Sequence, residues 1–252
     1  MIYAGLDVGS RTTVLALVDA EGGLGRSTIV DSGVNPLRRC QELLAGTSYH
    51  QLMLTGYGRH LVAPVVGGET VSEITAGAIG ARYLNADCRM VIDVGGQDSK
   101  VTVLSPAGDV VKFEMNDRCA AGTGRFLEVM AGTLEVPLAQ LGLLALGATR
   151  EIRINSLCTV FAESEVISLI ARGEEAGAIA LALHEAIATR ISGMARRVGV
   201  QPPVFFAGGG ALNPCLHHLL AKKLGFDVAV PPDPQVVPAL GAALLARRIG
   251  AG

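Results

Sequence analysis

The sequence predicts a chain of the α/β class in which two duplicated lobes face each other across a cleft. Half of its 252 residues are hydrophobic, yet aromatic residues make up only 4% and Trp is absent. A core built of Ala, Val, Leu and Ile favours close-packed layers of helix and sheet. The length is sufficient for one large domain or two closely packed lobes. The second observation is an internal repeat.

The repeat becomes visible when Asp7 is aligned with Asp93. The same pattern then appears at residues 2–18 and 91–104. Each copy has an apolar strand, the tripeptide Asp-Val-Gly, a few small polar residues and a second apolar strand. Each copy is typical of a β-hairpin with a glycine-containing turn. Two such hairpins indicate two related lobes, here 1–90 and 91–252, although two short turns can also match by chance. The final helix, 237–252, is expected to pack back on the first lobe.

Helices are expected between and after the hairpins. Apolar residues from Ile179 to Val198 recur at spacings of three and four, which predicts one long helix with a buried stripe that ends at Gly199. A strand at 204–206 leads into three glycines. The other expected helices cover 35–45, 72–84, 125–134, 159–172, a segment ending near Gly225, and the chain from about Val237.

Composition and charge exclude several classes of protein. The formal net charge is −2 and there is no basic block, so a nucleic-acid partner is not expected. The most apolar stretch, 136–148, is shorter than the roughly 18 residues of a membrane span. A strand starts directly after Met1 without a leader pattern, so a cytoplasmic protein is expected. Five cysteines without a leader do not indicate a disulfide framework, and some of their thiols are candidate ligands.

Both hairpin turns have the chemistry of a phosphate site. Glycines let backbone N–H groups approach phosphate oxygens, and a carboxylate can hold Mg²⁺ directly or through water. A carboxamide such as Gln97 can orient an attacking water, because phosphoryl transfer depends on positioning and charge stabilisation. The turns therefore predict a phosphate clamp with one side from each lobe: Asp7, Gly9 and Ser10 opposite Asp93, Gly95, Gly96 and Gln97.

Other nucleotide motifs do not fit. No Gly-x-x-x-x-Gly-Lys-Ser/Thr is present, and the segment 122–127 lacks the third glycine of a dinucleotide fingerprint. The turn Gly208, Gly209 and Gly210 lies between a predicted strand and a helix, where backbone without side chains lets an adenosine lie close. A simple tight turn is the alternative for that segment.

Two cysteines precede predicted helices. Cys119 and Cys158 are 39 positions apart, and a helix N-terminus stabilises the thiolate that binds metal. Two thiolates do not complete the four-cysteine shell of a [4Fe–4S] cluster, so ligation would require two chains that share it, as a symmetric homodimer. From the residues alone, ordinary buried thiols are the favoured interpretation, because free cysteines are commonly buried and no Cys-x-x-Cys spacing is present.

The sequence around these two cysteines resembles the BadF/BadG/BcrA/BcrD ATPase family, and within that family the activators of 2-hydroxyacyl-CoA dehydratases. The two long segments are Met115 to Leu127 and Ser156 to Ser168. Shorter matches occur in the same order along nearly the whole chain, at residues 2–10, 55–59, 91–98, 207–210 and 240–244. The cysteine segments are specific, whereas many actin-like ATPases share the glycine turns.

The resemblance implies an actin/Hsp70/sugar-kinase-like fold and a homodimer with one ATP per subunit and a shared [4Fe–4S] cluster. Cys119 and Cys158 would be the metal ligands, and Asp7, Ser10 and Gln97 the catalytic residues that position phosphate, Mg²⁺ and water. The other implied contacts to ATP or ADP are Gly9, Arg11, Thr12, Asp93, Gly95, Gly96, Asp98, Gly208, Gly209 and Gly210.

One position departs from the family. A lysine usually follows the serine of the first turn by four residues, and here that position is Val14. Lys100, at the equivalent place in the repeat, is retained. Arg11, where the family often has Thr, is a candidate substitute charge or a solvated side chain.

The implied function is ATP-dependent delivery of a low-potential electron. A ferredoxin or flavodoxin would reduce the protein, and a 2-hydroxyacyl-CoA dehydratase would accept the electron. A related reductase, of the benzoyl-CoA reductase or double-cubane cluster type, is an alternative acceptor. A small-molecule kinase and a nucleotide-dependent assembly or sensor protein are the competing classes. Cys40, Cys88 and Cys215 match no ligand segment and are interpreted as ordinary thiols.

Overall fold

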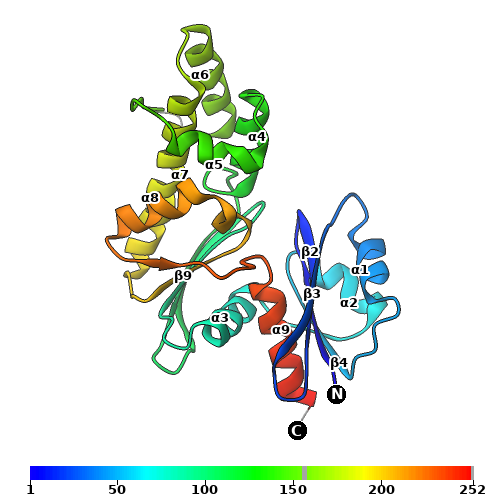
Figure 1. Cartoon of the computed structure of the whole chain (residues 1–252). Coiled ribbons are helices and arrows are strands. Elements are labelled where there is room, and N and C mark those ends of the chain that lie inside the picture. The colour runs from blue at the N-terminus through cyan, green and yellow to red at the C-terminus, as the bar shows by residue number, and fades with distance from the viewer. Residues whose placement is uncertain (155–157, 251–252) are drawn as a thin grey trace.

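The computed structural model describes residues 1–154 and 158–250, and in these ranges the strands form two five-stranded sheets in separate lobes (Figure 1). In the first sheet the order is β3-β2-β1-β4-β5. Its strands are β1 (Tyr3–Val8), β2 (Thr12–Val18), β3 (Leu24–Asp31), β4 (Gln51–Thr55) and β5 (Glu69–Thr70). The hairpin partners run antiparallel, and β4 lies parallel to β1.

The second sheet repeats this arrangement with the order β10-β9-β6-β7-β8. Its strands are β6 (Met90–Val94), β7 (Ser99–Leu104), β8 (Val110–Asn116), β9 (Val204–Ala207) and β10 (Val228–Ala229). Again three strands form an antiparallel meander, and β9 and β10 add in parallel. Strand for strand, the second sheet has the order and directions of the first. The predicted α/β class and the duplication of the hairpin are confirmed.

The register also aligns the two repeats residue by residue. Asp7 pairs with Val14 across the first hairpin, and Asp93 pairs with Lys100 across the second. On the parallel side Asp7 lies opposite Thr55 and Asp93 opposite Ala207. The two aspartates therefore occupy equivalent positions near the end of the first strand of each meander.

The helices follow the predicted ranges closely, with additions. Thr159–Ala171 (α6) and Ala176–Val198 (α7) match two predicted helices, and α7 carries a long buried stripe. Two helices were not predicted, α2 (Arg59–Val66) and α5 (Leu138–Leu146). The remaining helices are α1 (Pro36–Leu44), α3 (Glu73–Leu84), α4 (Gly124–Thr133), the 3₁₀ helix η1 (Gly209–Leu212), α8 (Pro214–Leu224) and α9 (Val237–Gly250).

The lobes exchange their last helices. Helix α9, which follows the second sheet in sequence, packs on β1, β2 and β4 of the first sheet. Helix α3, which follows the first sheet, lies against β6 to β9 of the second, and the two helices pack on each other between the lobes (Figure 1). A division at residue 90 thus separates the sheets but not the helices that cover them.

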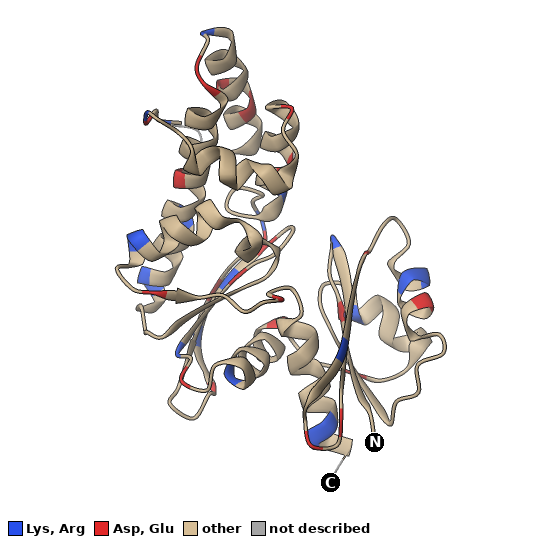
Figure 2. Ribbon diagram, in the orientation of Figure 1, with Lys and Arg blue, Asp and Glu red and all other residues tan. Residues whose placement is uncertain are grey.

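Each sheet is covered on both faces. Helices α1 and α2 cover one face of the first sheet, and α9 covers the other. The second sheet has the large core under α4 to α8 on one face and α3 on the other. Lys and Arg positions are interspersed with Asp and Glu over both lobes (Figure 2). Within residues 1–154 and 158–250 no single helix has the length and apolarity to cross a membrane; only α4 and α5 taken together, bent by 82°, meet that criterion.

Candidate functional site

The two hairpin turns have the same geometry. The amide of Gly9 donates to the carbonyl of Thr12 at 3.1 Å, and the amide of Gly95 donates to that of Asp98 at 3.0 Å. A side chain at either glycine would meet its partner residue, at 2.6 Å from the Thr12 carbonyl oxygen and 2.8 Å from Asp98 Oδ1. Each turn therefore needs glycine for close approach of backbone, which is the property expected of a phosphate turn.

A second pair of glycines holds the two aspartates. Gly56 follows β4 and Gly208 follows β9, and both have positive φ, 88° and 80°. A Cβ at Gly56 would collide with Oδ1 of Asp7, and one at Gly208 would collide with Oδ1 of Asp93. A left-handed backbone conformation is readily adopted only by glycine. The absence of a side chain at these two positions also lets the backbone approach each carboxylate closely.

All the predicted nucleotide-binding residues line one cavity of about 520 Å³ between the lobes. The first hairpin contributes Asp7 to Thr12 apart from Val8, and the second contributes Asp93 to Asp98 apart from Val94. The turn from Gly208 to Gly210 lines the same cavity, as do Glu73 of α3 and Asn213 at the start of α8. Its size and mixed lining suit a small-molecule ligand.

The buried side chain of Lys100 lines this cavity. Lys100 is 5% exposed, and its Nζ lies 2.6 Å from Glu73 Oε2 and 2.7 Å from Asp98 Oδ1. Burial alone would lower the pKa of Lys100, but the nearby carboxylates of Asp93, Glu73 and Asp98 raise it, so the ammonium stays charged. Glu73 was not predicted, because the sequence shows it only as the first residue of a helix.

The two aspartates differ in their electrostatics. Burial, followed by repulsion from Glu73 and Asp93, raises the pKa of Asp7 to about 8. Burial also raises the pKa of Asp93, but Lys100 opposes this and the pKa is about 6. Groups whose pKa is shifted by burial and charged neighbours in a cleft are candidates for function. A bound cation would favour the ionised form of both.

The valine at the family's lysine position is part of the core. Val14 is 1% exposed and packs with Tyr3, Ala16 and residues of α9. Cross-strand pairing places it opposite Asp7, where the second hairpin has Lys100 opposite Asp93. Asp7 therefore lacks the cross-strand cation that Asp93 has.

Arg11 reaches from the first lobe to the second. Its side chain lies over Gly96, where a Cβ would collide with Arg11 Cγ, and its Nε is 2.8 Å from Glu128 Oε1 on α4. Glu128 also accepts from Arg125 at 3.1 Å. Both Arg11 and Glu128 line the cavity, and about half of the Arg11 side chain is exposed.

The five cysteines divide by exposure. Cys40, Cys88 and Cys215 are fully buried, and burial raises the pKa of each thiol to about 11. Cys119 is partly buried in the loop before α4, and Cys158 is exposed as the residue that precedes α6. Ser156 and Leu157, which belong to the second cysteine segment, lie outside the described residues.

No metal site is complete within the part of the chain that the structure describes: no three His, Cys, Asp or Glu side chains there are arranged to hold an ion. Cys119 and Cys158 are also not among the residues that line the nucleotide-sized cavity. The two thiols therefore lie outside the lining of the cavity between the lobes.

The sequence matches the BadF/BadG/BcrA/BcrD ATPase family over residues 4–246. The chain belongs to this family. Among its curated relatives, the 2-hydroxyisocaproyl-CoA dehydratase activator of Clostridioides difficile is 37% identical over 98% of this chain and 95% of its own length. The (R)-2-hydroxyglutaryl-CoA dehydratase activating ATPase of Acidaminococcus fermentans is 38% identical over 96% of this chain and 95% of its own length.

Solved structures agree with the family. The Clostridium difficile activator, determined with bound ADPNP, has a TM-score of 0.92 and 36% identity, with 100% of this chain and 96% of that chain covered. A ROK family glucokinase from Streptomyces griseus is 15% identical and has a TM-score of 0.62, with 98% of this chain and 100% of the glucokinase covered. This likeness shows a shared fold only. The expected actin/sugar-kinase-like fold and the ATPase class are confirmed.

Proposed function

We propose that this ATPase delivers a low-potential electron to a 2-hydroxyacyl-CoA dehydratase and that it works as a homodimer with a shared [4Fe–4S] cluster. The proposal rests on full-length similarity to dehydratase activators and on one observation of the chain itself. Of its five cysteines, the two accessible ones are those in the family's cysteine segments. ATP would be hydrolysed to ADP and phosphate, and one electron would pass from donor to acceptor.

The nucleotide would bind in the cavity between the lobes with its phosphates between the two turns. Asp7 and Asp93 would hold Mg²⁺ directly or through water, with Ser10, Thr12 and Asp98 nearby as further oxygen ligands. Gln97 would orient the attacking water, and Arg11 would neutralise phosphate charge. The backbone at Gly208 to Gly210 would accommodate the adenosine, since a turn without side chains leaves room for it.

Cys119 and Cys158 fit a cluster by their chemistry. Ligation needs thiolate, and the raised pKa of the three buried cysteines disfavours it there. Two accessible thiols in each chain supply the four that a [4Fe–4S] cluster takes when two chains share it. When bound, the cluster would supply a one-electron redox centre.

A second copy of the chain is supported by the surface next to Cys158. Four large apolar side chains of α6 are exposed: Val160, Phe161, Ile167 and Ile170. Such a patch on a helix is typical of a protein interface. A homodimer that covers α6 would bring the Cys158 residues of both chains into the same region.

The donor would be a ferredoxin or flavodoxin, and the acceptor a dehydratase. A reductase is the second candidate acceptor, because one of the subunits of benzoyl-CoA reductase from Thauera aromatica is 28% identical over 96% of this chain and 92% of its own length. Electron transfer measured with each purified acceptor separates these two functions.

Iron content tests the shared cluster. Anaerobic purification should give about four irons and four sulfides per dimer, with a visible absorption band that air bleaches. Cys119→Ala and Cys158→Ala should both abolish it, whereas Cys40→Ala, Cys88→Ala and Cys215→Ala serve as controls with unchanged iron. Four irons per monomer, or a cluster that survives Cys158→Ala, contradicts shared ligation.

Electron transfer tests the role of ATP. The wild-type protein should reduce its acceptor only with ATP, and Cys119→Ala should retain ATP hydrolysis without any electron transfer. Equal transfer rates with ATP, with ADP and without nucleotide would leave a simple electron carrier that also hydrolyses ATP, and the proposal would fail.

A further inference from the structure

The main chain around Cys119 is fixed by an unusual set of hydrogen bonds. Nδ2 of Asn116, at the end of β8, donates to the carbonyls of Cys119 and Ala121, both at 2.9 Å. The hydroxyl of Thr123 donates to the carbonyl of Ala120 at 2.7 Å, and the buried hydroxyl of Ser99 donates to that of Gly122 at 2.9 Å. Four consecutive carbonyls are therefore held by side-chain donors, which is much more than a surface loop needs.

The far end of this loop is attached to the second phosphate turn. The first two amides of α4, those of Gly124 and Arg125, donate to the carbonyls of Gly95 and Gly96 at 2.9 and 2.8 Å. Amides at a helix start have no partner within the helix, so here the phosphate turn provides it. A movement of Gly95 and Gly96 must move the start of α4 or break these bonds.

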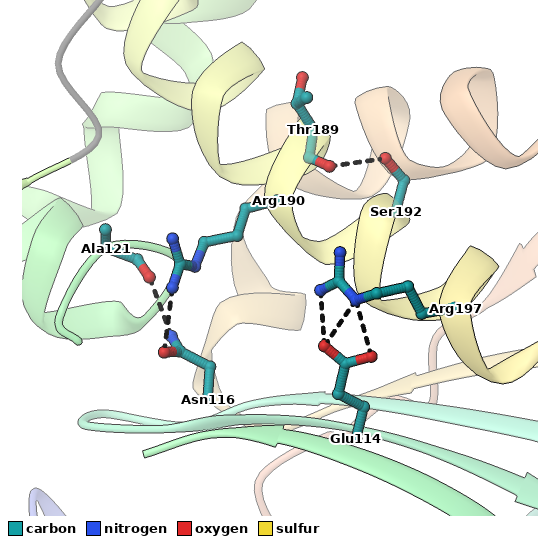
Figure 3. A network of polar contacts seen from close by, with 7 residues as sticks. All are labelled: Glu114, Asn116, Ala121, Thr189, Arg190, Ser192 and Arg197. Atoms are coloured by element: carbon teal, nitrogen blue, oxygen red, sulfur yellow. Dashed lines mark hydrogen bonds and ion pairs between the residues drawn. The ribbon is translucent and has the colours of Figure 1, made fainter. Parts of the chain in front are cut away.

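Arg190 of α7 contacts Asn116, at the start of this loop. Its guanidinium lies 3.3 Å from Oδ1 of Asn116, on the amide whose nitrogen serves the loop (Figure 3). The same side chain packs on the loop itself: a Cβ at Gly122 would lie 2.8 Å from Arg190 Cδ. Because Arg190 can only donate, it fixes which end of the Asn116 amide faces the loop.

We propose that Asn116 is a positioning residue that fixes the Cys119 thiol relative to the second phosphate turn, and that Arg190 orients the Asn116 amide. The inference deepens the proposed function, since it gives the Cys119 ligand a fixed mechanical connection to the nucleotide site. The loop transmits displacement of the turn to the thiol because its carbonyls cannot rearrange independently. No contact of Asn116 with the nucleotide is required.

Thiol alkylation of the iron-free, reduced full-length chain tests this. The test variant is Asn116→Asp, which keeps the size of the side chain but replaces both loop donors by a carboxylate oxygen. Mass spectrometry follows the alkylation of Cys119 by iodoacetamide, with Cys158 as the reference thiol in the same molecule. Because the variant removes two hydrogen bonds, the ratio of the Cys119 to the Cys158 rate should rise at least about fivefold, which is the population change expected for the loss of one net hydrogen bond.

Nucleotide provides the second readout. In the wild type, Mg²⁺ with ADPNP should change the Cys119 rate at least about twofold, the size of a weak coupling between two sites. In Asn116→Asp this response should be lost while the KM for ATP stays within about twofold, because the residue does not touch the cavity. A purely structural role for Asn116 would not remove the nucleotide response.

A matched control lies further along the same helix. Arg197 pairs with Glu114 of β8 through a bidentate contact that does not involve the loop (Figure 3). Arg197→Ala should leave both readouts at wild-type values, whereas Arg190→Gln should shift them in the direction of Asn116→Asp. If Asn116→Asp does not fold, Arg190→Gln carries the test.

Two results would overturn the inference: a Cys119 to Cys158 rate ratio that is unchanged in Asn116→Asp, and a wild-type Cys119 rate that does not respond to nucleotide. None of these readouts uses iron. A wild-type protein without iron would refute the proposed cluster but would leave the positioning of Cys119 as measured.

Discussion

The first and second phosphate turns share a backbone but not an electrostatic environment. Both are closed by a glycine amide, and in both a left-handed glycine lies against the aspartate. The cross-strand partner of Asp93 is the buried ammonium of Lys100, whereas that of Asp7 is the apolar Val14. The two turns thus share their backbone geometry, whereas the buried ammonium of Lys100 is the cross-strand partner of only the second aspartate.

The difference has a chemical consequence. Burial and repulsion from Glu73 and Asp93 raise the pKa of Asp7 to about 8, whereas the pKa of Asp93, which has Lys100 as its cross-strand partner, is about 6. A divalent cation near Asp7 would therefore relieve more electrostatic repulsion than one near Asp93. We expect the first turn to depend on Mg²⁺ and the second on Lys100.

The largest expected effect is on hydrolysis. Asp7→Asn and Asp93→Asn should each reduce the ATPase rate by about 10²- to 10³-fold, because each removes a carboxylate from the proposed site of the transferring phosphate. Asp109→Asn, in the turn between β7 and β8 and not among the residues that line the cavity, is the control. A steady-state ATPase assay with saturating Mg²⁺ measures all three. If both turn variants hydrolyse ATP at the wild-type rate, the site is wrong.

Lys100→Met should be strongly destabilising because it leaves Glu73 and Asp98 without their cation. We expect a loss of about 3 kcal/mol, since breaking a largely buried ion pair strands the remaining charge. Thermal denaturation should show this as a fall in Tm, and the ATPase rate should fall as well. Val14→Ala, at the equivalent position, should cost about 1–2 kcal/mol of packing and leave hydrolysis unchanged. Similar activity losses in both variants would contradict the asymmetry.

The left-handed glycines test what the turns still share. Gly56→Ala and Gly208→Ala should each lower stability by about 1–2 kcal/mol through backbone strain. Each should also reduce the ATPase rate about tenfold, because the new Cβ displaces the carboxylate of Asp7 or Asp93. Gly46→Ala, also left-handed but with open space around it, should lose only stability. Equal ATPase rates in all three variants would show that the two carboxylates tolerate displacement.

The last expected effect is a pH dependence of stability. Because the pKa of Asp7 is raised in the folded chain, the unfolded chain loses this proton first, and stability should fall as pH rises from about 4 to about 8. Asp7→Asn removes this cost, so its Tm should fall less than that of the wild type between pH 5 and pH 8. Melting curves at pH 5 and pH 8 without Mg²⁺ measure it. A variant with the wild-type difference between the two pH values would place the titration elsewhere.

The sequence predicted the elements whose signals are local. Both turns, the glycines after β9 and the stripe of α7 depend on neighbouring residues, and all lie close to the predicted ranges. Helix α5 was missed because it is apolar nearly all round, so no periodic stripe marks it. Helix α2 was missed because it is short and contains Pro64. Strand β8 was also not predicted, and it is an edge strand in which no residue is buried.

The parts of the site that depend on the helix exchange could not be read from sequence. Glu73 meets Lys100 only because α3 packs on the second sheet, and the sequence gives no sign of that packing. Arg11 and Glu128 are far apart in the chain, and the lobes must face each other before they can pair. The fixed Cys119 loop likewise requires Arg190 from α7, 74 residues beyond Asn116.

The exchange of α3 and α9 means that neither half of the chain is complete by itself. A single half with β1 to β5 and α3 would leave one face of its own sheet bare, and its helix would have no sheet to lie on. Two identical halves would complete each other, each lending its last helix to its twin. An isolated half would therefore be expected to pair with a second copy by exchange of this helix. Expressed alone, residues 1–90 should associate rather than remain single.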